Sequence, residues 1–404
     1  MAPINQPKLP TVQTQLLLHQ PRSPYETFAE GDIPNLKDGE LLVQVEAIGL
    51  NPIDWKSADF GFALPKLPCL NGREFVGTVV AQNTPQGSRI SVGDQVLAVA
   101  TDYRDFRKSA FQEYAVVCSF NAIKIPKGID PYQAASLGVA FVTAALSLGV
   151  CLGTTLPQQG KLSDLDLLSI LQRQEREMVP KDCFEEIFNP IPLGSRPSKG
   201  EWILLYGASS VTAQLCIQLA KATGLKIIGV VDVKKHGERL RALGVDVLVD
   251  RADLDLAATE VRQHTHGSLR FAMDFIGKET STWCQNVLAA CASSRYPTDI
   301  DDPDAIPDPF TQKGSTLSHL VCLTGAPKVK APNVRIHQVP VKMFHENEEL
   351  GCVLSYWLYH SLKNGVITLP ETQIVDGGLE VINSCLELMR RGEISGSRLV
   401  VKLK

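Results

Sequence analysis

The sequence predicts a two-domain protein of the α/β class, in which an all-β domain precedes a parallel α/β domain. Two observations carry this prediction: short alternating segments separated by glycines between residues 40 and 128, and one strand–turn–helix–strand unit from Lys199 to Asp232. A length of 404 residues also exceeds that of one ordinary domain.

The first domain is predicted from a series of short strands. The segment ELLVQVEAIGLN from Glu40 alternates apolar and polar residues, as a half-buried strand does. Similar short segments follow at 71–82, 92–100, 109–117 and 121–128, each bounded by glycine-containing turns. This spacing predicts a compact β barrel or sandwich.

Residues 131–148 have helical length and an apolar, small-residue composition, which predicts a helix joining the two domains. Residues 151–198 break the pattern, and we interpret them as an insertion or linker with one helix over 163–178, capped by Ser163. A solvated elaboration without function is the alternative. Residues 297–309 hold five acidic residues and four prolines, which predicts a loop.

The unit Lys199–Asp232 has the order expected of a dinucleotide-binding half. An apolar strand at 202–206 ends at Gly207, a helix follows the turn, and a second apolar strand ends at the acid. In such units a pyrophosphate binds at the helix N-terminus. Ser209 and Ser210 stand where a stronger fingerprint would have glycines, so an ordinary α/β unit without a nucleotide is the alternative.

The α/β pattern continues towards the C-terminus. A helix is predicted to end at Gly244, and the strand after it to end at Asp250. Two further strands are predicted at 268–277 and 317–327, and a helix around 350–362. The last 28 residues, from Gly377, predict a helix and a strand that returns to the first domain.

Composition excludes several classes of function. A net charge of −4 gives no electrostatic reason for a nucleic-acid partner or an anionic membrane surface. No apolar run approaches the ~20 residues that span a bilayer. Ten cysteines without a CxxC pair argue against a disulfide framework and a structural zinc cluster. We therefore expect a cytoplasmic protein.

Several motifs together resemble one superfamily. They are NPIDWK at 51–56, GREFVG at 72–77, SAFQEY at 109–114, LGVAFVTAA at 137–145, YGASSVTAQL at 206–215 and RRGEISGSRLVVKL at 390–403. In this order they resemble the medium-chain dehydrogenase/reductase superfamily, and within it the trans-acting enoyl reductases of fungal polyketide pathways, the lovastatin-type enzymes. The resemblance covers nearly the whole chain except about 154–197.

The resemblance implies a GroES-like β-barrel catalytic domain at 1–150, completed by 365–404, and a Rossmann-type doubly wound cofactor-binding domain at 199–364. It also implies a monomer.

The resemblance further implies a zinc-independent member. Zinc-dependent relatives hold the metal with cysteine and histidine, whereas Asn51 and Arg73 stand at the corresponding positions here. Glu74 alone is interpreted as a structural carboxylate. We therefore expect no stoichiometric zinc, and conjugate hydride addition rather than ketone reduction.

Site residues follow from the resemblance. The cofactor contacts it implies are Ile53, Asp54, Trp55, Lys56, Ser209, Ser210, Val211, Thr212, Val233, Lys234, Lys235, His236, Arg251, Leu323, Thr324, Ile394 and Ser395. The substrate contacts it implies are Val139, Ala140, Phe141, Val142, Thr143, Ala144, Ala145, Leu146, Val341, Lys342, Met343, Phe344 and His345. Lys56 is the expected catalytic residue.

Structural alternatives exist for the central members of this set. Thr143 has the alternative of a core hydroxyl bonded to its own helix. Ser209 and Ser210 have the alternative of helix caps, and Lys56 that of a solvated surface charge.

The residues leave the choice of cofactor open between two forms. Asp232 ends the second strand, where a carboxylate binds the ribose of NAD and repels the phosphate of NADP. Lys234, Lys235, His236 and Arg251 supply positive charge against it. Arg251 replaces an aromatic residue of the family and can stack on adenine in its place. We expect NADPH.

The resemblance implies that the protein reduces an α,β-unsaturated thioester on the acyl carrier protein of a polyketide synthase, alone or as a hybrid with a peptide synthetase. Two alternatives stay open: a free-standing quinone or enone reductase, and a non-reducing relative that acts as a binding or isomerising partner.

Overall fold

The computed structural model describes residues 9–160, 163–295 and 317–403. Contacts divide the chain into two compact units. The first unit takes in Met1–Val142, Gln159–Leu162 and Val341–Lys404, and the second takes in Thr143–Gln158 and Ser163–Pro340. The loop predicted at 297–309 lies outside the described residues.

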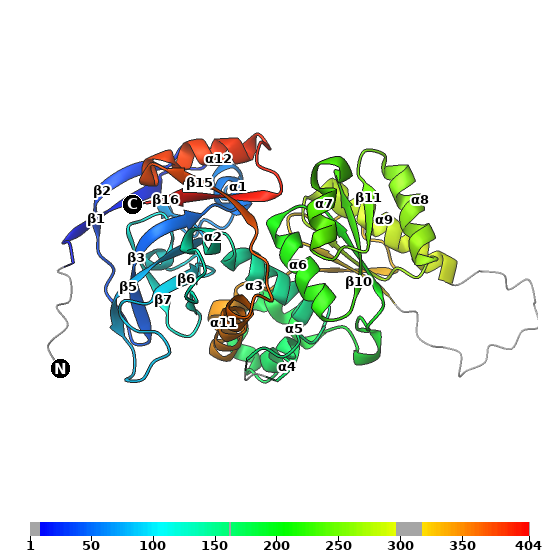
Figure 1. The fold of residues 1–404 in the computed structure, drawn as a ribbon, viewed down its shortest axis with the longest axis horizontal. Helices are drawn as coiled ribbons and strands as arrows, with labels where there is room; N and C mark the ends of the chain where they lie inside the picture. The colour runs from blue at the N-terminus through cyan, green and yellow to red at the C-terminus, as the bar shows by residue number, and fades with distance from the viewer. Residues whose placement is uncertain (1–8, 161–162, 296–316, 404) are drawn as a thin grey trace, which may run out of the picture. The chain divides into compact units, whose positions relative to one another are not determined.

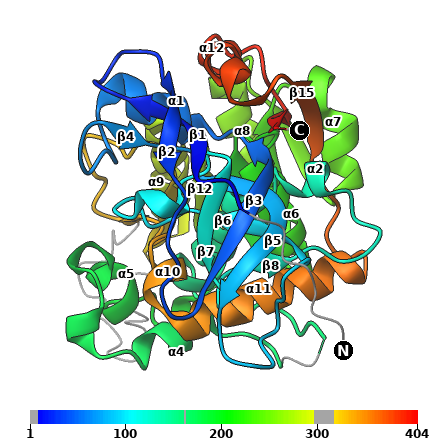
Figure 2. The ribbon, with the colours of Figure 1, turned by 90° about the vertical axis from the view of Figure 1, so that its left-hand side faces the viewer.

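The first unit contains two sheets (Figure 2). A seven-stranded sheet has the order β15-β16-β3-β5-β6-β8, with β7 also paired to β3, and a three-stranded sheet has the order β2-β1-β4. The strands are β1 Val12–Leu18, β2 Glu26–Asp32, β3 Glu40–Gly49, β4 Cys69–Leu70, β5 Glu74–Asn83, β6 Gln95–Val99, β7 Tyr114–Cys118, β8 Ile123–Lys124, β15 Glu371–Asp376 and β16 Ser397–Lys402.

The central pair of this sheet requires close approach of two backbones. Strands β3 and β5 are antiparallel, and a Cβ added at Gly77 would lie 2.0 Å from the carbonyl oxygen of Gln44. Only glycine avoids that overlap, so Gly77 permits the close approach of β5 to its neighbour β3.

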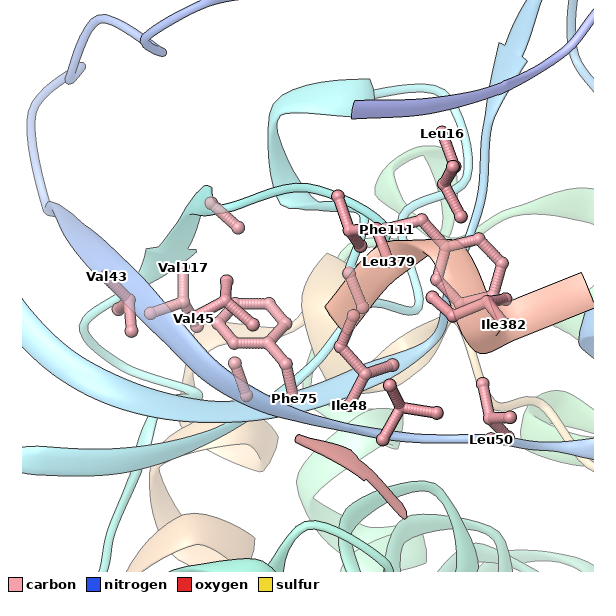
Figure 3. Close-up of a cluster of buried hydrophobic side chains, with 14 of the residues drawn as sticks. Leu16, Val43, Val45, Ile48, Leu50, Phe75, Phe111, Val117, Leu379 and Ile382 are labelled. Carbon is pink, nitrogen blue, oxygen red and sulfur yellow. The ribbon is translucent and has the colours of Figure 1, made fainter. Parts of the chain in front are cut away.

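One apolar core cluster joins the two ends of the first unit (Figure 3). Phe75 from β5 and Phe111 are fully buried in it, together with Ile48 of β3. Leu379 and Ile382, near the C-terminus, pack into the same cluster. Since β16 also pairs antiparallel with β3, the C-terminal segment belongs to this core.

Short helices complete the first unit. They are α1 Pro52–Phe60, α2 Pro131–Ala134, α10 Met343–Glu346, α11 Glu348–Lys363 and α12 Ile382–Arg390, with 3₁₀ turns η1 Phe106–Lys108 and η6 Gly378–Val381. Helix α11 lies beside β8 (Figure 2). Helix α3, Gly138–Leu146, begins in the first unit and continues into the second.

The second unit is built on a six-stranded parallel sheet of order β11-β10-β9-β12-β13-β14. The strands are β9 Trp202–Tyr206, β10 Lys226–Val231, β11 Val247–Asp250, β12 Phe271–Asp274, β13 Ser318–Cys322 and β14 Val334–His337. Helices α6 Val211–Ala222 and α7 Val233–Ala242 lie on one side, and α8 Leu254–Thr265 and α9 Lys278–Arg295 on the other (Figure 1). This doubly wound arrangement confirms the predicted fold class.

Residues 151–198 differ from the prediction of one helix over 163–178. The structure has two short helices, α4 Leu167–Gln172 and α5 Phe184–Phe188, with 3₁₀ turns η3 Arg176–Met178, η4 Lys181–Cys183 and η5 Leu193–Ser195. Leu165 is bridged to Leu156 by two backbone hydrogen bonds, which keeps this stretch extended. The helix therefore starts only after Asp166, whose carboxylate accepts from Ser169 N at 2.9 Å, and Ser163 is not its cap.

The predicted helix over 131–148 is also divided. Helix α2 ends at Ala134, α3 spans Gly138–Leu146, and a π-helical turn, η2, follows at Ser147–Cys151.

The core of the first unit supplies a test of its packing. Replacing Phe75 by alanine removes a fully buried ring, and we expect a loss of about 3–5 kcal/mol in the free energy of unfolding. Phe60, which is 67% exposed, is the matched control and should change stability little when replaced by alanine. Urea unfolding followed by circular dichroism measures both; equal midpoints for the two variants would contradict the assignment of this core.

Candidate functional site

Four groups of predicted cofactor residues lie at one edge of the second unit. Residues 209–212 follow β9, 233–236 follow β10, Arg251 follows β11, and 323–324 follow β13. Because these strands are parallel, their carboxyl ends share an edge of the sheet. That edge is where ligands bind in open α/β sheets.

The turn after β9 is shaped by one glycine. Gly207 has φ +80°, and a Cβ added there would lie 2.6 Å from the Ile276 side chain. Ser210 caps α6, since its hydroxyl accepts from Ala213 N at 3.2 Å. The cap interpretation of Ser210 therefore holds, and other N–H groups of the first turn have no acceptor within the helix. A helix N-terminus at this position suits a phosphate group.

Asp232 is engaged in the backbone of the next helix. Its carboxylate is the N-cap of α7 and accepts from Lys235 N at 3.0 Å. Asp250 supports the same helix end, accepting from Val233 N at 3.2 Å. Both carboxylates therefore accept hydrogen bonds from N–H groups at the start of α7. The side chains of Lys234, Lys235 and Arg251 are exposed.

Sequence analysis did not predict the segment after β12 as part of the site. This segment follows a strand that lies between β9 and β13 in the sheet. Ile276 is 47% exposed and covers Gly207, and the Asp274 carboxylate accepts from Gly277 N at 2.9 Å. The available signal was a large apolar residue directly after a buried strand.

In the first unit, helix α1 holds the predicted catalytic lysine. Asp54 is fully buried, and its Oδ2 accepts from Asn51 N at 2.7 Å, which fixes the first turn of the helix. Lys56 lies two residues further on and is partly exposed, with Nζ 5.7 Å from the centroid of the Trp55 ring. The same ring has the Arg390 guanidinium 5.6 Å from its centroid.

Asn51 and Glu74 belong to a buried polar network. Asn51 Nδ2 donates to Glu74 Oε1 at 2.8 Å, and Arg398 Nη1 donates to Asn51 Oδ1 at 2.6 Å. The second oxygen of Glu74 accepts from Val139 N at 2.8 Å, in the first turn of α3. Glu74 thus acts as a structural carboxylate that links β5, β16 and α3.

Arg73 is also held by protein groups. Its Nη2 donates to Asn71 Oδ1 at 3.0 Å, and its guanidinium carbon lies 3.7 Å from the centroid of the Tyr103 ring. A permanently charged guanidinium is no zinc ligand, so the donor set required for a catalytic zinc is not present at Asn51 and Arg73.

Burial dominates the electrostatics of this network. Burial raises the pKa of Asp54 to about 7, against the opposing effect of Arg73, and it also raises the pKa of Glu74. Burial lowers the pKa of Arg398. Asp54 Oδ1 is buried without a hydrogen-bond partner, so the neutral acid is favoured there.

Most of the predicted substrate residues on α3 are core residues. Val139 and Thr143, one helical turn apart, are partly exposed, whereas Ala140, Phe141, Val142, Ala144, Ala145 and Leu146 are buried. Phe141 stacks on Trp357 with ring centroids 5.6 Å apart. On this helix only Val139 and Thr143 therefore remain as candidate contacts.

The second predicted substrate segment falls at α10 in the first unit. Met343 and Phe344 are fully buried, while Val341 and Lys342 are partly exposed. His345 Nδ1 lies 2.8 Å from Thr101 Oγ1. Burial lowers the pKa of His345, although Asp102 and Glu346 oppose the shift.

The last predicted cofactor residues precede β16. Ile394 is partly buried and packs against the core of the first unit, and Ser395 is exposed.

Known proteins resemble this chain over its whole length or over its first unit. Residues 37–127 match the model of the alcohol dehydrogenase GroES-like domain. The chain is 25% identical over 399 residues to the trans-enoyl reductase caaB of Aspergillus niger, covering 98% of each chain. It is 26% identical over 407 residues to lovC of Aspergillus terreus, the enoyl reductase component of lovastatin nonaketide synthase, covering 99% of each. The chain is therefore similar to proteins of the medium-chain dehydrogenase/reductase superfamily.

The fold of this chain is shared by solved structures. The mycobacterial protein Rv1454c, complexed with NADPH, has a TM-score of 0.66 and 17% identity, with 96% of this chain and 99% of that chain covered. The curated relatives and the matched domain confirm the resemblance to superfamily oxidoreductases that the sequence predicts. In the described part of the chain, no helix is long and apolar enough to cross a membrane.

The pH dependence of stability that is linked to Asp54 tests the burial of this carboxyl group. Its pKa is higher in the folded chain than the ordinary 3.8, so the folded state binds the proton more tightly. The stability linked to this proton is complete below about pH 4 and is lost as pH rises towards 7. Between about pH 4 and pH 7, the free energy of unfolding of wild type should fall by up to about 4 kcal/mol relative to that of Asp54→Asn.

Urea unfolding of both proteins at several pH values measures this difference. Asp59→Asn, which alters a partly exposed carboxylate of the same helix, is the control. A difference between wild type and Asp54→Asn that does not change with pH would contradict the assignment.

Proposed function

We propose that this protein is an NADPH-dependent trans-acting enoyl reductase that serves a polyketide synthase. Its similarity to two fungal trans-enoyl reductases over almost the full length of each chain carries the proposal. The donor set at Asn51 and Arg73, unsuited to zinc, agrees with reduction of a conjugated C=C bond rather than a ketone.

The second unit would hold the cofactor at the carboxyl edge of its sheet. The α6 N-terminus and the turn at Gly207 suit the pyrophosphate. Lys234, Lys235 and Arg251 would bind the 2′-phosphate, because the neighbouring Asp232 carboxylate already accepts a bond from the α7 backbone. Residues 53–56 and 394–395 remain cofactor contacts that only the superfamily resemblance implies.

In the reaction, bound NADPH supplies the hydride that adds to the β carbon of the enoyl thioester. Negative charge then develops on the thioester oxygen, which needs a hydrogen-bond donor. Lys56 would supply that donor and pass a proton towards the α carbon. Its position in α1 is fixed by the Asp54–Asn51 contact.

The substrate would arrive on the acyl carrier protein of a polyketide synthase, either alone or fused to a peptide synthetase. Val139 and Thr143 are the α3 side chains with exposed surface for its acyl chain. NADPH oxidation measured with an enoyl thioester, with a simple quinone and without acceptor tests the proposal. Oxidation supported only by the quinone would replace it with a quinone reductase.

Lys56 is the residue whose replacement tests the mechanism. Lys56→Met should lower single-turnover reduction of an enoyl thioester by about 10²-fold, since the lost contact forms mainly in the transition state. NADPH affinity should be nearly unchanged. Lys66→Met, which removes an exposed lysine of the following loop, is the control. Equal falls in affinity and rate would make Lys56 a cofactor-binding residue instead.

Cofactor preference depends on the cationic side chains after β10. The double variant Lys234→Ala/Lys235→Ala should lose NADPH affinity by about 10-fold or more and leave NADH affinity nearly intact. Lys221→Ala removes a lysine from the opposite end of α6, where it pairs with Asp246, and should affect neither cofactor. Titration by intrinsic fluorescence measures the affinities of wild type and both variants for each cofactor. Tighter NADH binding by wild type would show that Asp232 determines the preference.

A further inference from the structure

Four buried polar side chains meet in the second unit, where strands β13 and β14 end the sheet order. Cys151 comes from the π-helical turn η2, Glu186 from α5, His337 from the end of β14, and His319 from β13. Their relative exposures are 1%, 4%, 0% and 2%. The proposed reduction uses none of these residues.

Three of them present ligand atoms to one another. The Cys151 sulfur, a Glu186 carboxylate oxygen and a His337 ring nitrogen all lie within 4.8 Å of one another. The closest approach, between Glu186 Oε2 and His337 Nδ1, is 2.7 Å. Thiolate, imidazole and carboxylate are the donors that proteins use for zinc.

The surroundings orient these donors as in a metal site. Glu186 Oε1 accepts from Gln338 N at 2.9 Å, which leaves Oε2 on the side of His337. The other ring nitrogen of His337, Nε2, lies 3.0 Å from His319 Nδ1. Metal-binding histidines and carboxylates commonly have such outer hydrogen bonds, which fix the ring and the carboxyl orientation.

We propose that Cys151 Sγ, Glu186 Oε2 and His337 Nδ1 bind one divalent transition-metal ion, Zn²⁺ by their donor chemistry. The carbonyl oxygen of Gln338 lies 3.8 Å from Cys151 Sγ and is the available fourth ligand. With four protein ligands and no solvent exposure, the site is a closed structural one rather than a catalytic one.

Binding balances charge and protons inside the cluster. The Cys151 S–H bond breaks, a metal–sulfur bond forms, and the proton passes to solvent. The proton between Glu186 Oε2 and His337 Nδ1 also leaves, while His337 Nε2 keeps its proton and donates it to His319 Nδ1, so the bound ring is a neutral imidazole. One thiolate and one carboxylate then neutralise the dication, so the buried site carries no net charge.

The ion would attach the 151–198 segment to the parallel sheet. Glu186 lies in this segment and His337 ends β14, and a neighbouring contact already joins the same parts, since Arg335 Nη2 donates to Glu185 O at 3.2 Å. Such an attachment would give the 151–198 segment a structural function. The alternative interpretation from the sequence was a solvated elaboration without function. It is separate from the superfamily zinc position at Asn51 and Arg73, and it departs from the sequence-based expectation of a protein without stoichiometric zinc or a structural zinc cluster.

The test uses the full chain produced in medium supplemented with Zn²⁺ or Co²⁺, because a closed site is loaded most readily during folding. We expect roughly one ion per chain by elemental analysis and, with Co²⁺, a thiolate-to-metal charge-transfer band. Cys151→Ser should lose the band. Cys216→Ala, which alters an equally buried cysteine of α6, should keep it.

A second variant separates metal binding from folding. His319→Gln keeps the three ligands but changes the partner of His337, and we expect about 10–100-fold weaker metal affinity in competition with a chelator. Wild type that carries no metal from either medium would overturn the proposal. So would a charge-transfer band that survives in Cys151→Ser.

Discussion

The Arg398–Asn51–Glu74 network is the interaction on which the first unit depends. It connects the terminal strand β16, the start of α1, strand β5 and the first turn of α3 through three buried side chains. Removing one partner of such a buried charge pair would leave an uncompensated charge, at a cost of about 3–5 kcal/mol. The positions of Lys56 and of Val139 therefore both depend on segments at opposite ends of the chain.

The same network occupies the place where zinc-dependent members of the superfamily hold their metal, as the resemblance aligns them. Asn51 accepts from a guanidinium and donates to a carboxylate, so both of its functional groups are used. Electrostatic support for a reaction in this unit must then come from hydrogen-bond donors and cations rather than from a Lewis acid at these residues.

In the second unit, helix capping determines which charges are available to a ligand. Asp232 and Asp250 both satisfy N–H groups at the start of α7, and this stabilises the helix while it reduces their capacity to bind a ribose. Lys234 and Lys235, beside Asp232, have exposed side chains. A capping role and a cofactor role thus compete for the same carboxylate.

The sequence by itself determined the features that depend on local periodicity. The parallel strands, the helix after Gly207 and the terminal helix and strand follow from apolar spacing and from glycines at the turns. The motifs also indicated the resemblance to the superfamily and the segments that follow the carboxyl ends of the parallel strands.

The tertiary structure decided what depends on contacts between distant residues. The bridge between Leu156 and Leu165 delayed the start of α4, and the raised pKa of Asp54 comes from burial that no local pattern reveals. Cys151, Glu186 and His337 are far apart in the chain and match no spacing motif, so only folding brings their ligand atoms together. Long-range packing and desolvation are the physical reasons, since neither is encoded in the spacing of neighbouring residues.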